Sequence, residues 1–374
     1  PIPEAPPETK ARLFLRSKYL VSIVNLILII FHQGYLDPII NHQIQLASRP
    51  QGKPKTEDLK LVEEELNETA EGQVLVRNHF LSLDPYMRGR MNTSKSYAKA
   101  VEVGEVMTGG TVGEVVESRH TDFKTGDMVV GNGGWQEYSL IDGALCRKVD
   151  PSWPSPSLAL GVLGMPGVTA YTGLENIGKP KAGETLVVAA ASGAVGAVVG
   201  QIAKIRGARA IGIAGSDEKC QYVKTTLGFD ECLNHHNPAL SVKLKEACPD
   251  GIDVYFENVG GRVFQAVQPL LKDFARIPVC GLIAHYNDTQ LPEGPDPTPR
   301  LMRDILVKRL TYRGFIVWDF ASQENEALEN LAAWIAEGKL QYREDFINGL
   351  EHAPEAFFGL LQGKNFGKLL VRLC

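Results

Sequence analysis

The residues that determine the architecture of this protein are 186–196, which read LVVAAASGAVG. The apolar run that opens this segment predicts a buried strand, and residues 194–206 predict a helix. A strand that passes through a glycine turn into a helix forms the phosphate loop of a dinucleotide-binding unit. Gly193 would let the backbone approach a pyrophosphate, Gly196 would let the helix pack closely on the strand, and Ala190 stands where the first glycine is usual. The alternative is that these glycines only ease packing, with no ligand bound.

Strands and helices alternate from this segment onward. The predicted strands are 185–190, 208–214, 252–257, 276–280 and 310–317, and the predicted helices are 194–206, 218–227, 263–271 and 324–337. Such alternation is typical of a parallel sheet with helices on both faces. We therefore predict an α/β fold in which a doubly wound parallel sheet, the Rossmann arrangement, carries the nucleotide site.

The residues from Asn41 onward have a different pattern of short strands and dense turn signals. Strands are predicted at 73–77, 111–117, within 123–130 and at 135–141. The final strand, 366–373, is expected to return to this first region. The sequence therefore predicts two domains, one rich in β-strands and one doubly wound.

The composition excludes some classes of protein. Of 374 residues, 44% are hydrophobic and 22% are charged, which rules out wholesale disorder. Lys and Arg number 39 against 44 Asp and Glu, so the net charge of −5 argues against a nucleic-acid binder. The six cysteines include no CxxC pair, which favours reduced thiols and a cytoplasmic location.

The first forty residues differ from the rest. Basic residues between 10 and 18 precede an apolar run at 20–31, which imitates a signal peptide but is followed by no small-residue cleavage site. The run is also too short for a membrane span, which needs about 20 apolar residues. An appended helix, an expression artefact and a wrongly assigned start are the other interpretations, and this segment does not determine the location.

The end of the second strand of the doubly wound region indicates which dinucleotide is bound. An NAD enzyme usually has Asp or Glu there to hold the ribose hydroxyls. Here the strand ends in Gly215 and Ser216, and Lys219 follows in the first turn of the next helix. A phosphate on the ribose would explain both the small residues and the nearby charge, so NADPH or NADP is the expected cofactor. The alternative for Lys219 is a solvated surface lysine.

Seven sequence motifs follow one another along the chain in the order found in a known family. They are LDPYMR at 83–88, GMPGVTAY at 164–171, the AASGAVG loop, GSDEK at 215–219, ENVGG at 257–261, CGLIAHYN at 280–287 and GFIV at 314–317. Together they resemble the zinc-independent medium-chain dehydrogenase/reductases of the prostaglandin reductase, leukotriene hydroxydehydrogenase and alkenal double-bond reductase type, and particularly their bacterial curcumin reductase branch. The resemblance runs from about Asn41 to the C-terminus.

The resemblance implies a set of cofactor-binding positions. They are Gly193, Ala194, Val195 and Gly196 for the pyrophosphate, Gly215, Ser216, Lys219 and His235 around the 2′-phosphate, and Asn258, Cys280, Gly281, Leu282, Ile283, Ala284, His285, Tyr286, Phe315, Ile316, Val317 and Asn365 around the nicotinamide half. His235 is a departure, because the family usually has a tyrosine there. A histidine could still contact a phosphate, and would do so more strongly when protonated.

The chemistry expected from these residues needs no metal ion. No Cys and His cluster or His-Glu-x-x-His stretch with zinc-ligand spacing is present, so no metal site is predicted. Hydride addition to the β carbon of an enone or enal forms an enolate, which a hydrogen bond can stabilise. Tyr286, at the end of the strand 276–280, is the candidate donor and sole candidate catalytic residue. Its alternative role is packing on the cofactor.

Two further residues are expected in the substrate pocket. Tyr86 and Met165 resemble family positions that face the cleft, although ordinary packing is an equally good explanation, and Arg88 is expected to form structural hydrogen bonds. The domains implied are an unassigned extension at 1–40, a GroES-like catalytic domain at 41–163 with 336–374, and an inserted Rossmann NADP-binding domain at 164–335.

The predicted activity is NADPH-dependent reduction of the carbon–carbon double bond of α,β-unsaturated aldehydes or ketones. An NADPH quinone reductase of the same superfamily and a non-catalytic NADPH-binding sensor are the alternatives. The resemblance also implies a homodimer, formed by extending a sheet through the strand at 310–317. A small-molecule substrate is the expected partner, with no nucleic acid and no membrane span.

Overall fold

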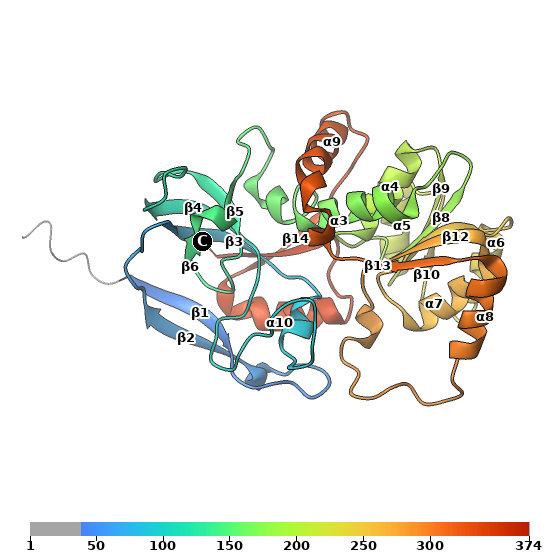
Figure 1. Ribbon diagram of the computed structural model, residues 1–374, viewed down its shortest axis with the longest axis horizontal. Coiled ribbons are helices and arrows are strands. Elements are labelled where there is room, and N and C mark those ends of the chain that lie inside the picture. The colour runs from blue at the N-terminus through green and yellow to red at the C-terminus, as the bar shows by residue number, and fades with distance from the viewer. Residues whose placement is uncertain (1–38, 374) are drawn as a thin grey trace, which may run out of the picture. The chain divides into compact units, whose positions relative to one another are not determined.

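The computed structural model describes residues 39–373 (Figure 1). The apolar run at 20–31 lies outside these residues. Within residues 39–373, no helix has both the length and the apolar character that a membrane crossing requires. Residues 42–62 and those from 69 onward form one compact unit, and the site described below lies entirely within it.

A six-stranded parallel sheet follows from the segment that opens the phosphate loop. Its spatial order is β10 (Glu231–Asn234), β9 (Arg209–Ala214), β8 (Thr185–Ala189), β11 (Ile252–Phe256), β12 (Leu271–Val279) and β13 (Thr311–Gly314). Numbered along the chain from β8, this order is 3-2-1-4-5-6, the order of a dinucleotide-binding doubly wound sheet. The predicted α/β Rossmann arrangement is therefore confirmed.

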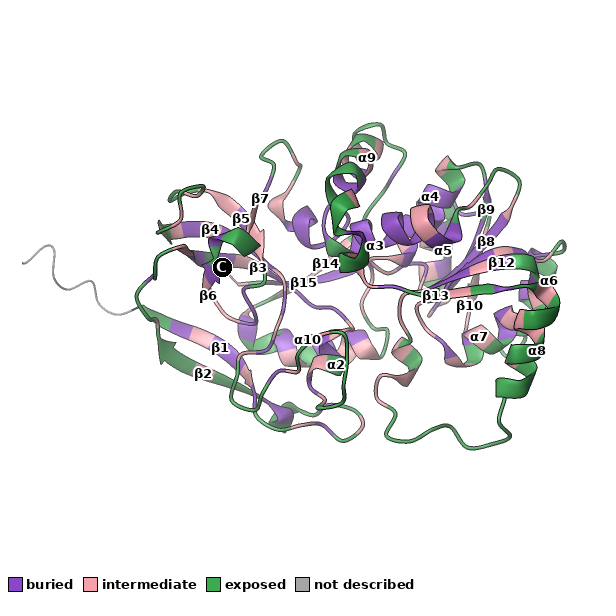
Figure 2. Ribbon diagram, viewed as in Figure 1, coloured by how far each residue is buried: buried purple, intermediate pink, exposed green. Residues whose placement is uncertain are grey.

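The central strand β8 is buried on both faces, as its continuous apolar sequence requires. Leu186 and Val188 face one hydrophobic core, and Val187 and Ala189 face the other. Helices α3 (Met165–Gly173), α4 (Gly196–Ile205), α5 (Asp217–Thr225) and α9 (Glu324–Ala336) contribute to the first core. Helices α6 (Leu240–Ala247), α7 (Gly261–Val267) and α8 (Thr298–Lys308) cover the other face (Figures 1 and 2).

A second, seven-stranded sheet contains most of the remaining strands. Along its main path lie β14 (Glu344–Asn348), β15 (Lys368–Arg372), β3 (Gln73–Ser82), β4 (Thr111–Ser118), β5 (Met128–Gly131) and β7 (Arg147–Lys148), and β6 (Tyr138–Asp142) pairs with β3. The strand predicted at 366–373 does return to this sheet, where β15 pairs antiparallel with β3 and parallel with β14.

Four further elements accompany this sheet. Strands β1 (Ile40–Leu46) and β2 (Leu59–Glu65) form a separate two-stranded pair. Helices α2 (Met87–Arg90) and α10 (Ala353–Leu361) contribute Met87 and Phe357 to a core around Trp135, whose ring meets that of Phe357 edge to face at 5.6 Å. This core fixes the start of α2 and hence the segment that precedes it.

The structure corrects several predicted boundaries. The helix predicted at 263–271 ends at Val267, because Pro269 follows in a tighter turn and the chain then enters β12 at Leu271, earlier than predicted. The strand predicted at 310–317 is shorter, since β13 ends at Gly314 and the chain turns at Ile316, whose amide donates to Asp319. Helix α4 begins two residues later than predicted, at Gly196.

Candidate active site

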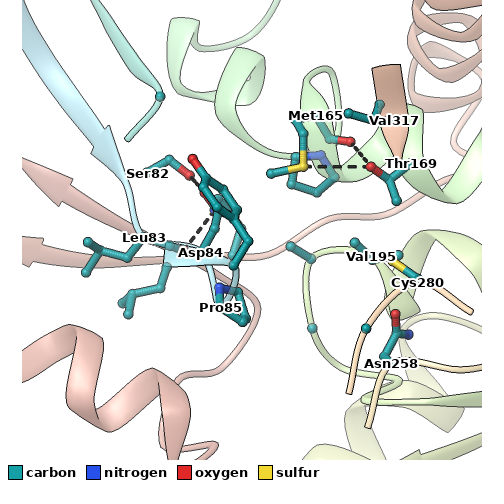
Figure 3. Close-up of a pocket in the computed structure, with 18 of the residues that line it drawn as sticks. Ser82, Leu83, Asp84, Pro85, Met165, Thr169, Val195, Asn258, Cys280 and Val317 are labelled. Atoms are coloured by element: carbon teal, nitrogen blue, oxygen red, sulfur yellow. Dashed lines mark hydrogen bonds and ion pairs between the residues drawn. The ribbon is translucent and has the colours of Figure 1, made fainter. Parts of the chain in front are cut away.

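A cavity of about 1030 Å³ opens at the carboxyl ends of the central parallel strands. Its wall includes residues of both sheets, among them Ser82 at the end of β3 and Ala214 at the end of β9. Ligands bind at this edge of open α/β sheets. All but three of the predicted site residues line it; Ser216, Leu282 and His285 do not. Figure 3 shows the segment from Ser82 to Pro85 facing Val195, Cys280 and Asn258 across the cavity.

The phosphate loop has the backbone that a dinucleotide requires. Ala190 adopts a left-handed conformation with φ of 54°, the conformation that a glycine would take most easily there. A β carbon on Gly196 would lie 2.2 Å from the carbonyl oxygen of Ala190, so helix α4 packs directly against the end of β8. Gly193, Ala194, Val195 and Gly196 face the cavity, where the N-terminus of α4 favours an anion. The loop fits a pyrophosphate.

The residues predicted around a 2′-phosphate lie together. Gly215, Lys219 and His235 line the cavity at the ends of β9 and β10. The Lys219 ammonium donates to the carbonyl oxygen of Gly363 at 2.5 Å, and partial burial lowers its pKa. Burial lowers the pKa of His235, and electrostatic interactions with His236, Arg262 and Lys219 lower it further, which favours its neutral form.

Ser216 does not line the cavity but supports a residue that does. It is the N-cap of α5, and its hydroxyl accepts a hydrogen bond from the Lys219 amide at 3.1 Å. Ser216 thereby fixes the first turn of α5, from which the side chain of Lys219 extends. Ser216 therefore supports the predicted cofactor site through Lys219 and does not itself line the cavity.

A buried carboxylate shapes the turn after β11, a role that the sequence did not reveal. Glu257 accepts hydrogen bonds from the hydroxyl of Tyr255 and from the amides of Val259 and Gly260, each at 2.8 Å. Burial raises its pKa, and these three donors oppose that effect. The turn directs Asn258 into the wall, where its amide donates to the carbonyl oxygen of Ala189 at 2.9 Å.

Tyr286 lies in the cavity wall in the turn that follows β12. Its ring folds back over Gly281, and its hydroxyl oxygen accepts a hydrogen bond from the Leu282 amide at 3.3 Å. Burial is the main cause that raises the pKa of Tyr286 above its ordinary value of 10.0. The phenol is therefore protonated at neutral pH and can donate a hydrogen bond.

Two residues predicted beside Tyr286 are absent from the wall. Leu282 is 40% exposed, and His285 forms a 2.7 Å contact between Nδ1 and a carboxylate oxygen of Asp288. Leu282 and His285 belong to the turn after β12, and neither lines the cavity. Gly281, Ile283 and Ala284 do line the cavity, as does Cys280, whose thiol has a pKa raised to about 12 by burial.

The remaining predicted residues complete the wall. Phe315, Ile316 and Val317 line it after β13, and the Phe315 ring meets that of Phe256 at 6.1 Å. Asn365 lines it too, with its side-chain amide donating to the carbonyl oxygen of Gly367 at 2.8 Å. Met165 enters the wall from the start of α3.

Aromatic residues that the sequence did not single out stand at one part of the wall. The Tyr97 and Trp318 rings meet edge to face at 6.1 Å, although the two residues belong to distant segments. The Arg90 guanidinium lies 5.2 Å from the centre of the Tyr97 ring and 5.5 Å from that of Tyr86, which was predicted to line the substrate pocket. Burial raises the pKa of Tyr86 well above its ordinary value, so its phenol is neutral too.

A buried ion pair also borders the cavity. Lys368 on β15 approaches Asp84 to 2.6 Å and donates to the carbonyl oxygen of Leu83 at 3.1 Å. The other oxygen of Asp84 accepts a hydrogen bond from Ser82 (Figure 3). Lys368 and Asp84 are almost fully buried, and no sequence motif indicated their pairing.

Between residues 39 and 373, no three His, Cys, Asp or Glu side chains are grouped as metal ligands would be.

Comparison with known proteins now places the chain in a family. Residues 42–149 match the family model described as the N-terminal domain of oxidoreductase, and residues 194–336 match one described as zinc-binding dehydrogenase. An NADPH-dependent curcumin reductase of Escherichia coli is 53% identical over 334 residues, which cover 89% of this chain and 97% of that protein. This chain is a medium-chain dehydrogenase/reductase. It belongs with the prostaglandin, curcumin and alkenal reductases, a resemblance that the seven motifs had indicated.

Two other members are similar over most of their length. An NADP(+)-dependent 2-alkenal reductase of Nicotiana tabacum is 42% identical, with 90% of this reductase and 98% of that protein covered. The crystal structure of CurA from Vibrio vulnificus in complex with NADPH has a TM-score of 0.86 and 53% identity, with 89% and 99% of the two chains covered. The fold, with its N-terminal β domain and its Rossmann-like sheet, is that of the family.

Proposed function

We propose that this reductase uses NADPH to reduce the carbon–carbon double bond of α,β-unsaturated aldehydes and ketones. The observation that carries the proposal is the position of the Tyr286 phenol, in the wall of the cavity that the phosphate loop opens onto. The names of the curcumin reductase and alkenal reductase relatives support the same class of reaction. Gly215, Lys219 and His235, gathered at the end of β9, support NADPH over NADH.

The residues of this chain would act on the substrate oxygen. When bound, the reduced nicotinamide supplies the hydride. Tyr286 would donate a hydrogen bond to the carbonyl oxygen, where negative charge grows as the double bond is reduced, and such donors stabilise a transition state most in a buried site. The phenol can then supply a proton for the α carbon. Tyr86 and Met165 would contact the body of the substrate.

Several narrower predictions belong to the same proposal. The reaction is expected to need no zinc, and the domains are expected to divide at 41–163 with 336–374 and at 164–335. A homodimer is expected to form through β13, the last strand at one end of the six-stranded sheet. A cytoplasmic location is also expected, because the six cysteines include no CxxC pair, which favours reduced thiols.

The test is a substrate panel with purified protein. Cinnamaldehyde, benzalacetone and menadione are each mixed with NADPH, and then with NADH, while loss of the reduced cofactor is followed by absorbance. We expect oxidation of NADPH with the enal and the enone, and identification of the products as saturated carbonyl compounds by mass spectrometry. The saturated aldehyde 3-phenylpropanal is the matched control for carbonyl reduction, and it should not be consumed.

Each other outcome selects a different function. Turnover of menadione alone would favour a quinone reductase. Tight NADPH binding with no turnover of any compound would favour a sensor. Consumption of 3-phenylpropanal at a rate similar to that of cinnamaldehyde would show carbonyl reduction, and the proposed double-bond chemistry would be wrong.

A further inference from the structure

The segment Leu83–Arg88 contributes Tyr86 to the cavity, but its last residue does not reach the cavity. Arg88 is only 3% exposed, and each of its three guanidinium nitrogens donates to a neutral oxygen. Nη2 donates to the carbonyl oxygen of Gly52 at 2.7 Å, and Nη1 donates to Asn92 Oδ1 at 2.7 Å. Nε donates to Asn287 Oδ1 at 3.0 Å. The guanidinium is held in one orientation by acceptors on three segments.

The bond to Asn287 joins distant parts of the chain. Arg88 follows β3 of the seven-stranded sheet, whereas Asn287 follows β12 of the parallel sheet, 199 positions later. The neighbouring backbone is close as well, since a β carbon on Gly52 would lie 3.8 Å from the Asn287 carbonyl oxygen. Arg88 therefore connects the side of the cavity that carries Tyr86 with the turn after β12.

Asn287 is the residue directly after Tyr286. The contacts of Tyr286 within its own turn are long: its amide donates to the Ile283 carbonyl oxygen at 3.4 Å, and its hydroxyl accepts from the Leu282 amide at 3.3 Å. These bonds lie at or beyond the upper end of normal hydrogen-bond distances. The shorter, charged bond from Arg88 to the next residue is thus the firmer anchor of this part of the turn.

We infer that Arg88, through Asn287, is a positioning residue for Tyr286, an inference that rests on the proposed role of Tyr286 as hydrogen-bond donor. Arg88 holds the turn so that the Tyr286 hydroxyl is fixed relative to the wall that Tyr86 forms. A displacement of about 1 Å in a reacting group can lower a rate by as much as about 100-fold. Loss of the bond should thus affect turnover more than cofactor binding.

The variant that tests this is Asn287→Ala, because Asn287 is half-buried and Arg88 keeps its two other acceptors. With benzalacetone and saturating NADPH, kcat should fall about 10-fold, while the Kd for NADPH stays within about 2-fold. Asn287→Asp keeps an oxygen acceptor for Arg88 and should restore most of the lost turnover. Thr289→Ala, in the same loop but exposed, is the matched control and should leave kcat unchanged.

A double-mutant cycle with Tyr286→Phe separates positioning from a general structural effect. When the hydroxyl is absent, its position has no consequence, so Asn287→Ala should cost less than about 2-fold in the Tyr286→Phe background. The same 10-fold loss in both backgrounds would overturn the inference and leave the proposed function intact. If Tyr286→Phe alone leaves kcat unchanged, the role of Tyr286 is wrong and the inference falls with it. Thermal unfolding of each variant checks that it is folded.

Discussion

At the scale of single residues, the protonation state of Tyr286 gives the first prediction. The proposed donor is the protonated phenol, and burial raises its pKa above 10.0. Because a raised pKa keeps the acid form present at higher pH, this contribution to kcat is complete below pH 10 and is lost only as the pH rises through the raised pKa. We expect kcat to show no decline due to Tyr286 between about pH 6 and 9.

The check is the pH profile of kcat for the wild type and for Tyr286→Phe. The variant should turn over about 100-fold more slowly, which is the lower end of the usual effect of general acid catalysis. A decline below pH 9 in the wild type that disappears in the variant would contradict the raised pKa. Burial is the main cause of this shift, so the sequence could suggest Tyr286 but not the change in its pKa.

Lys219 gives a second prediction at this scale. Lys219 lies in the first turn of α5, and the Gly363 carbonyl oxygen holds its ammonium at the cavity wall. Lys219→Ala should lower the ratio of kcat/KM for NADPH to that for NADH by about 10-fold or more, since a charged hydrogen bond contributes about 1.5–3 kcal/mol. Lys224→Ala on the same helix, where the lysine pairs with Glu231 outside the cavity wall, is the control. An unchanged ratio in Lys219→Ala would mean that Lys219 is a solvated surface lysine that does not select the cofactor.

How much of the site the sequence predicts depends on how local each feature is. Gly193, Gly196 and Lys219 follow from spacing along one strand, turn and helix, which the chain specifies locally. Tyr97 and Trp318 meet only after both parts of the wall have folded, and neither belongs to a pattern of fixed spacing. Nearness to the LDPYMR motif could have suggested Arg90 and Tyr97, and Trp318 directly follows the GFIV motif, but no pattern in the sequence indicates that Tyr97 and Trp318 meet.

At the scale of elements, the buried strands were the most predictable and the exposed or short ones the least. All five residues of β8 are buried, so its apolar run is continuous. The sequence of β10 is Glu-Cys-Leu-Asn, and β14 has no fully buried residue, so neither shows a clear apolar period. Helix α8 has no buried residue, and three of its 11 residues are arginine or lysine (Figure 2).

The contact between α4 and β8 gives a prediction for the phosphate loop. A β carbon on Gly196 would meet the Ala190 carbonyl oxygen at 2.2 Å and the Ala190 carbonyl carbon at 2.8 Å, and backbone atoms cannot rotate away. Gly196→Ala must therefore move α4 away from the strand. We expect a loss of about 1–3 kcal/mol in the free energy of unfolding, as for other overpacked sites. A weaker affinity for NADPH should accompany it.

Thermal unfolding and NADPH titration measure both effects. Gly359→Ala in α10 is the matched control, since a β carbon there would be 3.6 Å or more from its neighbours, and alanine favours the helical conformation. This control should unfold at or above the wild-type temperature and bind NADPH normally. A Gly196→Ala protein with unchanged Tm and unchanged affinity would show that the loop tolerates a side chain, contrary to the geometry described.

At the scale of the whole molecule, the last described strand, β15, joins the same sheet as β3, which lies far earlier in the chain. Strand β15 pairs with β3, and Lys368 on β15 reaches Asp84, 284 positions earlier in the chain, with both side chains buried beside the cavity. No local pattern could predict this pair, because only the return of the C-terminal strand brings the two residues together. The pair connects the last strand to the segment that carries Tyr86.

Removal of one member of this pair should destabilise the protein strongly. In Lys368→Met the Asp84 carboxylate stays buried without its cation, which usually costs about 3–5 kcal/mol. The double variant Asp84→Asn with Lys368→Met removes both charges and keeps an oxygen for the Ser82 hydroxyl, so it should regain much of that loss. Lys339→Met, which breaks the exposed pair with Glu337, should cost no more than about 1 kcal/mol. Urea unfolding of the four proteins measures these differences, and equal losses in Lys368→Met and Lys339→Met would mean that the buried pair does not hold the C-terminal strand in place.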